Sequence, residues 1–113
     1  MSNFYYSNDA ELQTLVEGKN YRRLMARGGE LMLVEVIFEN GAVGEPHTHV
    51  HEQASYCIEG EFEFTIGDET KVIKQGDTIY MPSNVLHGCK LLSDKGRLLD
   101  IFTPQREDFL KKG

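Results

Sequence analysis

The sequence has few cysteines and few basic residues. Its two cysteines, Cys57 and Cys89, are too few for the disulfide framework of a small secreted protein. We therefore expect both thiols to be reduced and to serve as small buried hydrophobic residues. Cys89 lies two residues past His87, so a role in the same interior as that histidine stays open.

Lysine and arginine total twelve against eighteen acidic residues, which gives a net charge of −6. A nucleic-acid-binding protein would carry the opposite balance, so we expect no nucleic-acid partner. An anionic small molecule is not excluded, because a single local arginine can override the overall sign. No apolar run approaches the roughly 20 residues of a transmembrane helix, so we expect no membrane association. The first residues, MSNFYYSNDAEL, lack the basic start and apolar core of a signal peptide, which predicts a cytoplasmic location.

Short apolar runs separated by glycine-rich turns fill most of the chain. Residues 31–38 follow a Gly28-Gly29 turn as the second half of a predicted β-hairpin, and the apolar side chains of residues 62–66 alternate with polar ones. No helical pattern interleaves with these runs, which argues against a parallel α/β sheet. The pattern predicts one all-β domain over residues 1–113, a barrel or sandwich, with a single short helix over residues 105–112.

The histidines are concentrated in two turn-rich segments. His47, His49 and His51 alternate within residues 41–60, and His87 ends the second segment, residues 76–87. A strand directs alternate side chains to one face, so His47 and His49 are expected to share a centre. Imidazole nitrogens together with an amide oxygen suit a divalent transition metal. We predict a metal site formed by His47, His49, Gln53 and His87, if folding brings the two segments together.

Three neighbouring residues leave alternatives open. His51 either contacts the metal or is turned outward by a bend or bulge. Glu52 would replace Gln53 as a ligand if the strand slipped by one residue, and Gln53 itself either binds the metal or only forms hydrogen bonds inside the barrel. Zinc, nickel, manganese, iron and cobalt all suit nitrogen-rich ligation. A neutral amide ligand leaves the ion its full positive charge, which favours Lewis-acid chemistry.

The last apolar run contains the candidate residue for proton transfer. Asp100 alternates with Leu98 and Phe102 on one face, and if that face is inward, desolvation raises the pKa of the carboxyl group toward neutrality. Such a group transfers protons efficiently near pH 7. The alternative places Asp100 outside or in a salt bridge. Arg106 follows the turn at Pro104 and is either a clamp for a substrate carboxylate or a surface charge.

Two motifs resemble those of the cupin superfamily. Residues 41–60 read G-x5-H-x-H-x3-Q-x6-G and residues 76–87 read G-x5-P-x-N-x2-H, and the gap between them is short. The resemblance implies a double-stranded β-helix, or jelly-roll barrel, and a bound metal. Three residues depart from the usual pattern: Gln53 stands for a glutamate, Asn84 for a glycine and Leu91 for an asparagine.

Gln53 together with the later Asp100-x-Phe102-x3-Arg106 is similar to the small pectin-degradation cupins of the KdgF type. That resemblance implies metal-dependent linearisation of 4,5-unsaturated monouronates from pectin or alginate breakdown to open-chain 4-deoxy-5-keto uronates. Arg106 would bind the substrate carboxylate, Asp100 would move the proton, and Phe102 would pack against the sugar. The alternatives are a cupin dioxygenase that uses iron, and a cupin that binds a sugar or small ligand without catalysis. We also predict a homodimer, because open barrels often cover an exposed sheet edge with a partner.

Overall fold

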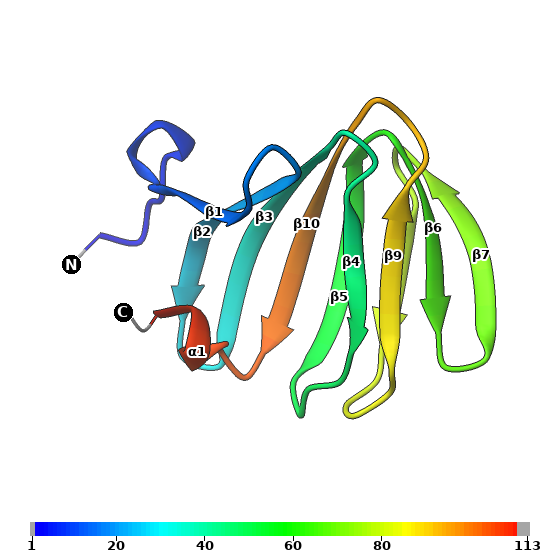
Figure 1. The fold of residues 1–113 in the computed structure, drawn as a ribbon. Helices are drawn as coiled ribbons and strands as arrows, with labels where there is room; N and C mark the ends of the chain where they lie inside the picture. Colours follow the sequence, from blue (N-terminus) through cyan, green and yellow to red (C-terminus); the bar gives the residue numbers. More distant parts are fainter. Residues whose placement is uncertain (1, 111–113) are drawn as a thin grey trace.

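The computed structural model describes residues 2–110, and its strands form two antiparallel sheets packed face to face (Figure 1). The larger sheet contains, in order across the sheet, β1 (Leu12–Val16), β2 (Asn20–Gly28), β3 (Leu31–Glu39), β10 (Lys95–Thr103), β5 (Glu52–Glu59) and β8 (Thr78–Met81). The smaller sheet contains β4 (Val43–His47), β9 (His87–Leu91), β6 (Glu61–Ile66) and β7 (Glu69–Lys74). This architecture confirms the predicted all-β barrel of jelly-roll type.

Two short helical segments complete the described chain. A 3-10 turn, η1 (Ser7–Asp9), precedes β1, and α1 (Glu107–Leu110) follows β10. The predicted C-terminal helix over residues 105–112 is therefore present but begins two residues later, at Glu107, and the part of the prediction beyond residue 110 lies outside the described residues. No helix between residues 2 and 110 has the length and apolar composition needed to cross a membrane.

The apolar core fills the space between the sheets at one end of the barrel. Phe62 and Phe64 of β6 are buried, as their alternation predicts, and the Phe62 ring packs edge-on against Phe38 with centroids 5.0 Å apart. A Cβ atom at Gly96 of β10 would lie 2.5 Å from the Phe62 ring, so this glycine is required by the packing. Cys57 belongs to the same core, as predicted. A second, smaller apolar cluster contains Met32, Val34 and Phe102, and polar inward residues beside it form the candidate site.

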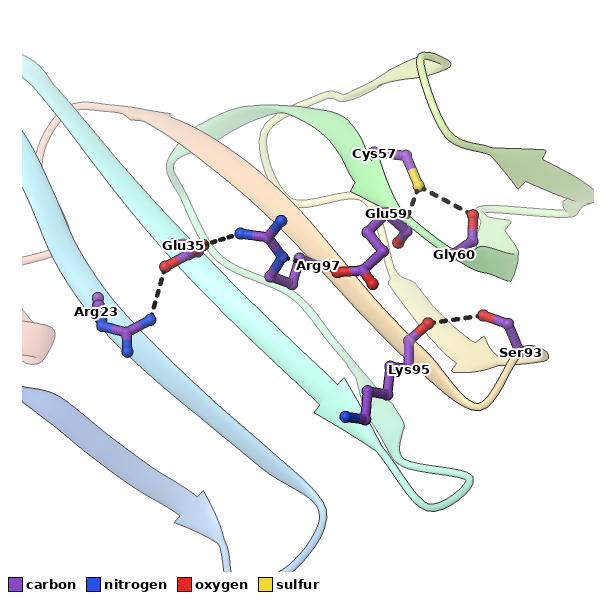
Figure 2. A network of polar contacts seen from close by, with 8 residues as sticks. All are labelled: Arg23, Glu35, Cys57, Glu59, Gly60, Ser93, Lys95 and Arg97. Carbon is purple, nitrogen blue, oxygen red and sulfur yellow. Dashed lines mark hydrogen bonds and ion pairs between the residues drawn. The ribbon is translucent and has the colours of Figure 1, made fainter. Parts of the chain in front are cut away.

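The outer face of the larger sheet carries a network of ion pairs (Figure 2). Glu35 of β3 accepts from Arg23 of β2 and from Arg97 of β10, both at 3.0 Å, and Arg97 also donates to Glu59 at 2.9 Å. The network links four adjacent strands, β2, β3, β10 and β5. Isolated exposed pairs contribute about 0.2–1 kcal/mol each, so the main effect of this network is to neutralise charge on the sheet face.

Candidate metal centre and active site

Strand pairing brings the two histidine segments together. His47, the last residue of β4, lies opposite His87, the first residue of β9. His49 belongs to the loop between β4 and β5, so the expectation that His47 and His49 alternate along one strand is wrong in detail. The strand ends earlier because the loop makes hydrogen bonds to the second segment: the Asn84 backbone N–H donates to the His49 carbonyl at 2.8 Å. The loop, rather than strand alternation, directs His49 to the common centre.

The three imidazole rings converge on one point. Ring nitrogens of His47, His49 and His87 lie within 4.8 Å of one another, a spacing at which they could hold a metal ion. The ring centroids of His47 and His87 are 4.5 Å apart, and those of His49 and His87 are 4.8 Å apart. Three of the four predicted ligands thus meet.

Backbone hydrogen bonds determine which nitrogen of each ring is free. The Nδ1 atoms of His47, His49 and His87 lie 2.8, 2.9 and 3.0 Å from the carbonyl oxygens of Glu45, His51 and Val85, respectively. A carbonyl oxygen only accepts, so each Nδ1 carries the proton and each Nε2 presents a lone pair. This tautomer is the one that binds a metal through Nε2.

Gln53 is the fourth residue at this centre, and its geometry suits a cation. Its Oε1 lies 3.0 Å from Nε2 of His49, while its Nε2 donates to Ser55 Oγ at 3.1 Å. Gln53 Oε1 and an unprotonated His49 Nε2 are both acceptors, and such a contact is unfavourable without a cation between them. Burial lowers the pKa of His49, and it lowers the pKa of His87 to about 4, so both rings are neutral at pH 7.

The Nε2 atom of His87 supplies a second observation. It is buried and makes no hydrogen bond to any described residue. Buried polar atoms are rarely left unsatisfied, and each one needs an explanation. A divalent cation bound by three imidazoles and one amide oxygen satisfies both His87 and the Gln53–His49 pair, so the residues present fit a metal.

Asp100 faces the interior, the first of the two alternatives left by the sequence. Ser55 of β5 donates from Oγ to Asp100 Oδ1 at 2.6 Å and accepts from Gln53. Burial raises the pKa of Asp100 to about 6, despite the opposing effects of the hydrogen bonds and of Arg106. The chain His49–Gln53–Ser55–Asp100 therefore connects the metal centre to a carboxyl group that titrates near neutrality.

Arg106 and Phe102 lie beside this carboxyl group. The Arg106 guanidinium carbon is 5.1 Å from the Phe102 ring centroid and 4.2 Å from that of Phe109. Its Nε and Nη2 donate to both carboxylate oxygens of Asp108, at 3.1 and 2.9 Å. Arg106 thus reaches the site rather than solvent, but one edge of its planar group is already occupied.

A cavity of about 160 Å³ joins these groups between the two sheets. Its walls include His47, His87, Gln53, Asp100, Phe102 and Arg106. Six of the seven residues proposed from the sequence therefore line a single cavity. The seventh, His49, is attached to it through Gln53.

The residues with open roles lie at the edge of the site. His51 is not one of the three histidines that converge; its ring packs edge-on against that of His49, with centroids 5.6 Å apart, and it lines a surface depression with residues of the α1 segment. Glu52 is exposed and accepts from the Tyr80 hydroxyl, while Gln53 is buried, so β5 has the register that the metal prediction requires. Cys89 lines the cavity, where burial raises the pKa of its thiol to about 12 and keeps it protonated at neutral pH.

Sequence reasoning missed three residues that line or connect the site. Ser55 follows Gln53 at the spacing that shares a strand face, so the same alternation could have identified it. Arg22 alternates with the inward residues Asn20 and Leu24 of β2 and could have been found in the same way. Phe109 carried no such signal, because the position of α1 over the cavity depends on tertiary packing.

Comparison with known proteins gives matches over nearly the whole chain. A family model described as a cupin domain matches residues 34–102. The pectin degradation protein KdgF of Dickeya dadantii is 34% identical over 111 residues, which cover 97% of this chain and 100% of that protein. The crystal structure of an RmlC-like cupin from Shewanella frigidimarina has a TM-score of 0.89 and 36% identity, with 96% of each chain covered. The structure of KdgF from a Halomonas species also gives a TM-score of 0.89, at 32% identity, covering 96% of this chain and 99% of the other.

Proposed function

Because this chain belongs to the cupin family and is similar to KdgF over almost its full length, we propose that it is a metal-dependent enzyme of pectin or alginate breakdown. Its reaction is the linearisation of 4,5-unsaturated monouronates to open-chain 4-deoxy-5-keto uronates. The observation that supports this function best is the hydrogen-bonded chain from Gln53 through Ser55 to Asp100, which sets a carboxyl group of pKa about 6 beside a candidate metal centre.

The reaction needs one group that both accepts and returns a proton. In the cyclic substrate, the ring oxygen joins the hemiacetal carbon C1 to C5 of the C4=C5 double bond. Removal of the proton on O1 and cleavage of the bond between C1 and the ring oxygen give an aldehyde at C1 and an enolate at C5. The enolate becomes a ketone when C4 gains a proton. The net change is an isomerisation, which consumes neither water nor an oxidant.

Asp100 is the group in the cavity suited to this transfer. A carboxyl group whose pKa is about 6 is present in both protonation states near neutral pH, so it accepts the O1 proton and donates to C4 at little cost. Ser55 holds Oδ1 of Asp100 in place through its hydroxyl hydrogen bond. The second oxygen, Oδ2, is then the atom that exchanges the proton with the substrate.

The remaining residues bind and orient the sugar. Arg106 donates to the substrate carboxylate from Nη1, since its Nε and Nη2 are engaged by Asp108. Phe102 provides an apolar surface against one face of the ring. His47, His49, His87 and Gln53 would hold the metal, which would supply Lewis-acid polarisation of a substrate oxygen.

We extend the proposal to the whole protein. Residues 1–113 form one cupin domain that acts in the cytoplasm as a homodimer. Support for the dimer comes from the outer face of the larger sheet, where Leu99 and Ile101 of β10 are apolar although Leu98 and Phe102 already fill the core. Tyr56 and Tyr80 on the same outer face are 43% and 56% exposed. A second copy would cover this surface.

The test is an ultraviolet assay with the purified, metal-loaded protein. The conjugated unsaturated uronate absorbs in the ultraviolet, and ring opening removes that absorbance. We expect rapid loss of absorbance, a product of the same mass as the substrate, and inhibition by a chelator that is reversed when metal is returned. Spontaneous opening at the rate of the protein-free control would overturn the proposal. Oxygen consumption would favour a dioxygenase instead, and saturable binding without turnover would favour a sugar-binding protein.

A further inference from the structure

Arg22 is a charged residue that faces the interior of the barrel. It lies on β2 between Asn20, which is buried, and Leu24, which packs against the core. Its neighbour Arg23 points the opposite way and joins the outer ion-pair network (Figure 2). Strand alternation thus places two consecutive arginines on opposite faces of one sheet. A cation at an interior position is rare unless it is paired or functional.

The partners of Arg22 leave its charge uncompensated. Its Nε donates to Oε1 of Gln13 on β1 at 2.8 Å, which fixes the orientation of the guanidinium group. Among residues 2–110 it forms no ion pair with any carboxylate. Burial lowers its pKa, although Asp108 acts in the opposite direction. Its two terminal nitrogens therefore retain donors for a ligand.

Arg22 and Arg106 meet at the same aromatic ring and line the same cavity. Their guanidinium carbons lie 3.9 and 4.2 Å from the centroid of Phe109. Both belong to the wall of the cavity that contains Asp100 and His87. Asp108 neutralises one of the two cations through its paired contact with Arg106. Arg22 has no such ion-pair partner among residues 2–110, so its donors remain available to an anionic ligand.

We propose that Arg22 is a second substrate-binding residue, which together with Arg106 binds the carboxylate of the uronate and selects acids over neutral sugars. The inference rests on the proposed function, because it assigns the anion-binding part of that site. Arg106 alone is poorly suited to the task, since its Nε–Nη2 edge is engaged by Asp108. The planar donors of Arg22 match a carboxylate and are not engaged by any acid.

The experiment compares Arg22→Gln and Arg22→Lys with wild type and with Arg23→Gln, a matched control on the same strand whose side chain faces outward. Titration calorimetry on the metal-loaded proteins measures the Kd of D-galacturonate and of its uncharged methyl ester, and the ultraviolet assay gives kcat and KM. We expect Arg22→Gln to raise the Kd of the acid and the KM of the unsaturated uronate about tenfold or more. The Kd of the ester and the kcat should change by less than about threefold. Arg22→Lys should recover part of the loss, and Arg23→Gln should match wild type.

Retained binding of the ester also reports that Arg22→Gln is folded. Equal loss of acid and ester binding in Arg22→Gln would assign Arg22 a packing role and overturn the inference. Two other results would also overturn it: an Arg22→Gln variant that binds the acid as tightly as wild type does, or a wild type that does not bind the acid more tightly than the ester. The two proposals fail separately. If the protein binds the acid more tightly than the ester through Arg22 but does not turn over the uronate, the proposed reaction is rejected and the anion-binding site is retained. Turnover with an unchanged KM for the uronate and an unchanged Kd for the acid in Arg22→Gln would reject the anion site and keep the proposed reaction.

Discussion

The Nε2 atom of His87 is buried and, within the described part of the chain, has no hydrogen-bond partner, so a change at His87 separates metal binding from folding. We expect His87→Leu to weaken zinc binding by at least about a hundredfold, because one of four ligands is lost. The metal-free protein should be as stable as wild type or more stable by about 1 kcal/mol, since an unsatisfied polar group is replaced by an apolar one. Calorimetric zinc titration and urea unfolding measure the two effects.

His51→Leu is the matched control for this experiment. His51 also has a buried, unpartnered Nδ1 among the described residues, but it is not one of the three histidines whose ring nitrogens converge. It should retain zinc affinity within a fewfold. Zinc affinity that is unchanged in His87→Leu, or lost equally in both variants, would contradict the ligand assignment.

Asp100 should also influence the stability of the metal-free protein as a function of pH. Its pKa of about 6 in the folded state lies above the value of about 3.9 for an unfolded aspartate, so folding favours the protonated form. The free energy of unfolding should therefore fall as pH rises from about 4 to 6, by an amount of order 2 kcal/mol from this group. Asp100→Asn should remove that loss, so the free energy of unfolding of the variant, compared with that of wild type at the same pH, should be higher at pH 7.5 than at pH 4. Urea unfolding of both proteins at both pH values measures the difference, and a pH-independent difference would contradict the raised pKa.

Strand alternation in the sequence predicted which side chains share a sheet face, but not always whether that face is the buried one. Alternation along β10 was enough to place Asp100 with Leu98 and Phe102, but it left the choice of face open. That choice depends on which side of the sheet packs against β6 and β9, which is a tertiary property. Arg22 was missed although it alternates with Asn20 and Leu24, because the sequence prediction did not use alternation over residues 20–26.

The loop that contains His49 depends on an unusual backbone position in the second motif. Asn84 has a φ of 62°, and its N–H donates to the His49 carbonyl. The left-handed region disfavours side chains by about 1–2 kcal/mol, least for glycine and asparagine, and this explains why asparagine replaces the usual glycine here. Asn84→Val should destabilise the protein by about 1–2 kcal/mol and weaken metal binding, because the turn that supports the His49 loop is strained.

Asn84→Gly provides the comparison, since glycine adopts the same backbone conformation without strain. It should remain within about 0.5 kcal/mol of wild type and keep its metal affinity. Thermal unfolding and zinc titration of both variants test this turn. Equal stabilities for Asn84→Val and Asn84→Gly would show that the conformation is not what matters at this position.

At the level of elements, the apolar runs between turns in the sequence predicted the positions of most strands. The β2–β3 hairpin and the alternating β6 lie where the sequence placed them. The main differences are at element ends. Strand β9 begins only at His87, because Val85 completes a turn in which its N–H donates to the Pro82 carbonyl. Such ends depend on hydrogen bonds that local apolar patterns do not reveal.

The outer face of the larger sheet combines exposed tyrosines with a network of ion pairs, and we expect two copies to associate through it. The two arginines and two glutamates of that network, Arg23, Arg97, Glu35 and Glu59, balance one another in charge, which limits repulsion between two identical faces (Figure 2). Ile101→Lys should convert the dimer to a monomer, because it places a charge in the buried centre of the interface. Val72→Lys, an exposed position on β7 of the other sheet, should remain dimeric. Sedimentation velocity at micromolar concentration measures both, and a monomeric wild type would contradict the interface.

The claim that a carboxyl group beside a three-histidine, one-amide metal centre opens unsaturated uronates is tested most directly by the turnover of Asp100→Asn. The ultraviolet assay should be run with wild type and variant at equal metal content, established by elemental analysis. We expect the variant to keep its metal and to lose turnover by about a hundredfold or more, since a side-chain amide cannot exchange the proton. Turnover equal to that of wild type, at equal metal content, would contradict the mechanism.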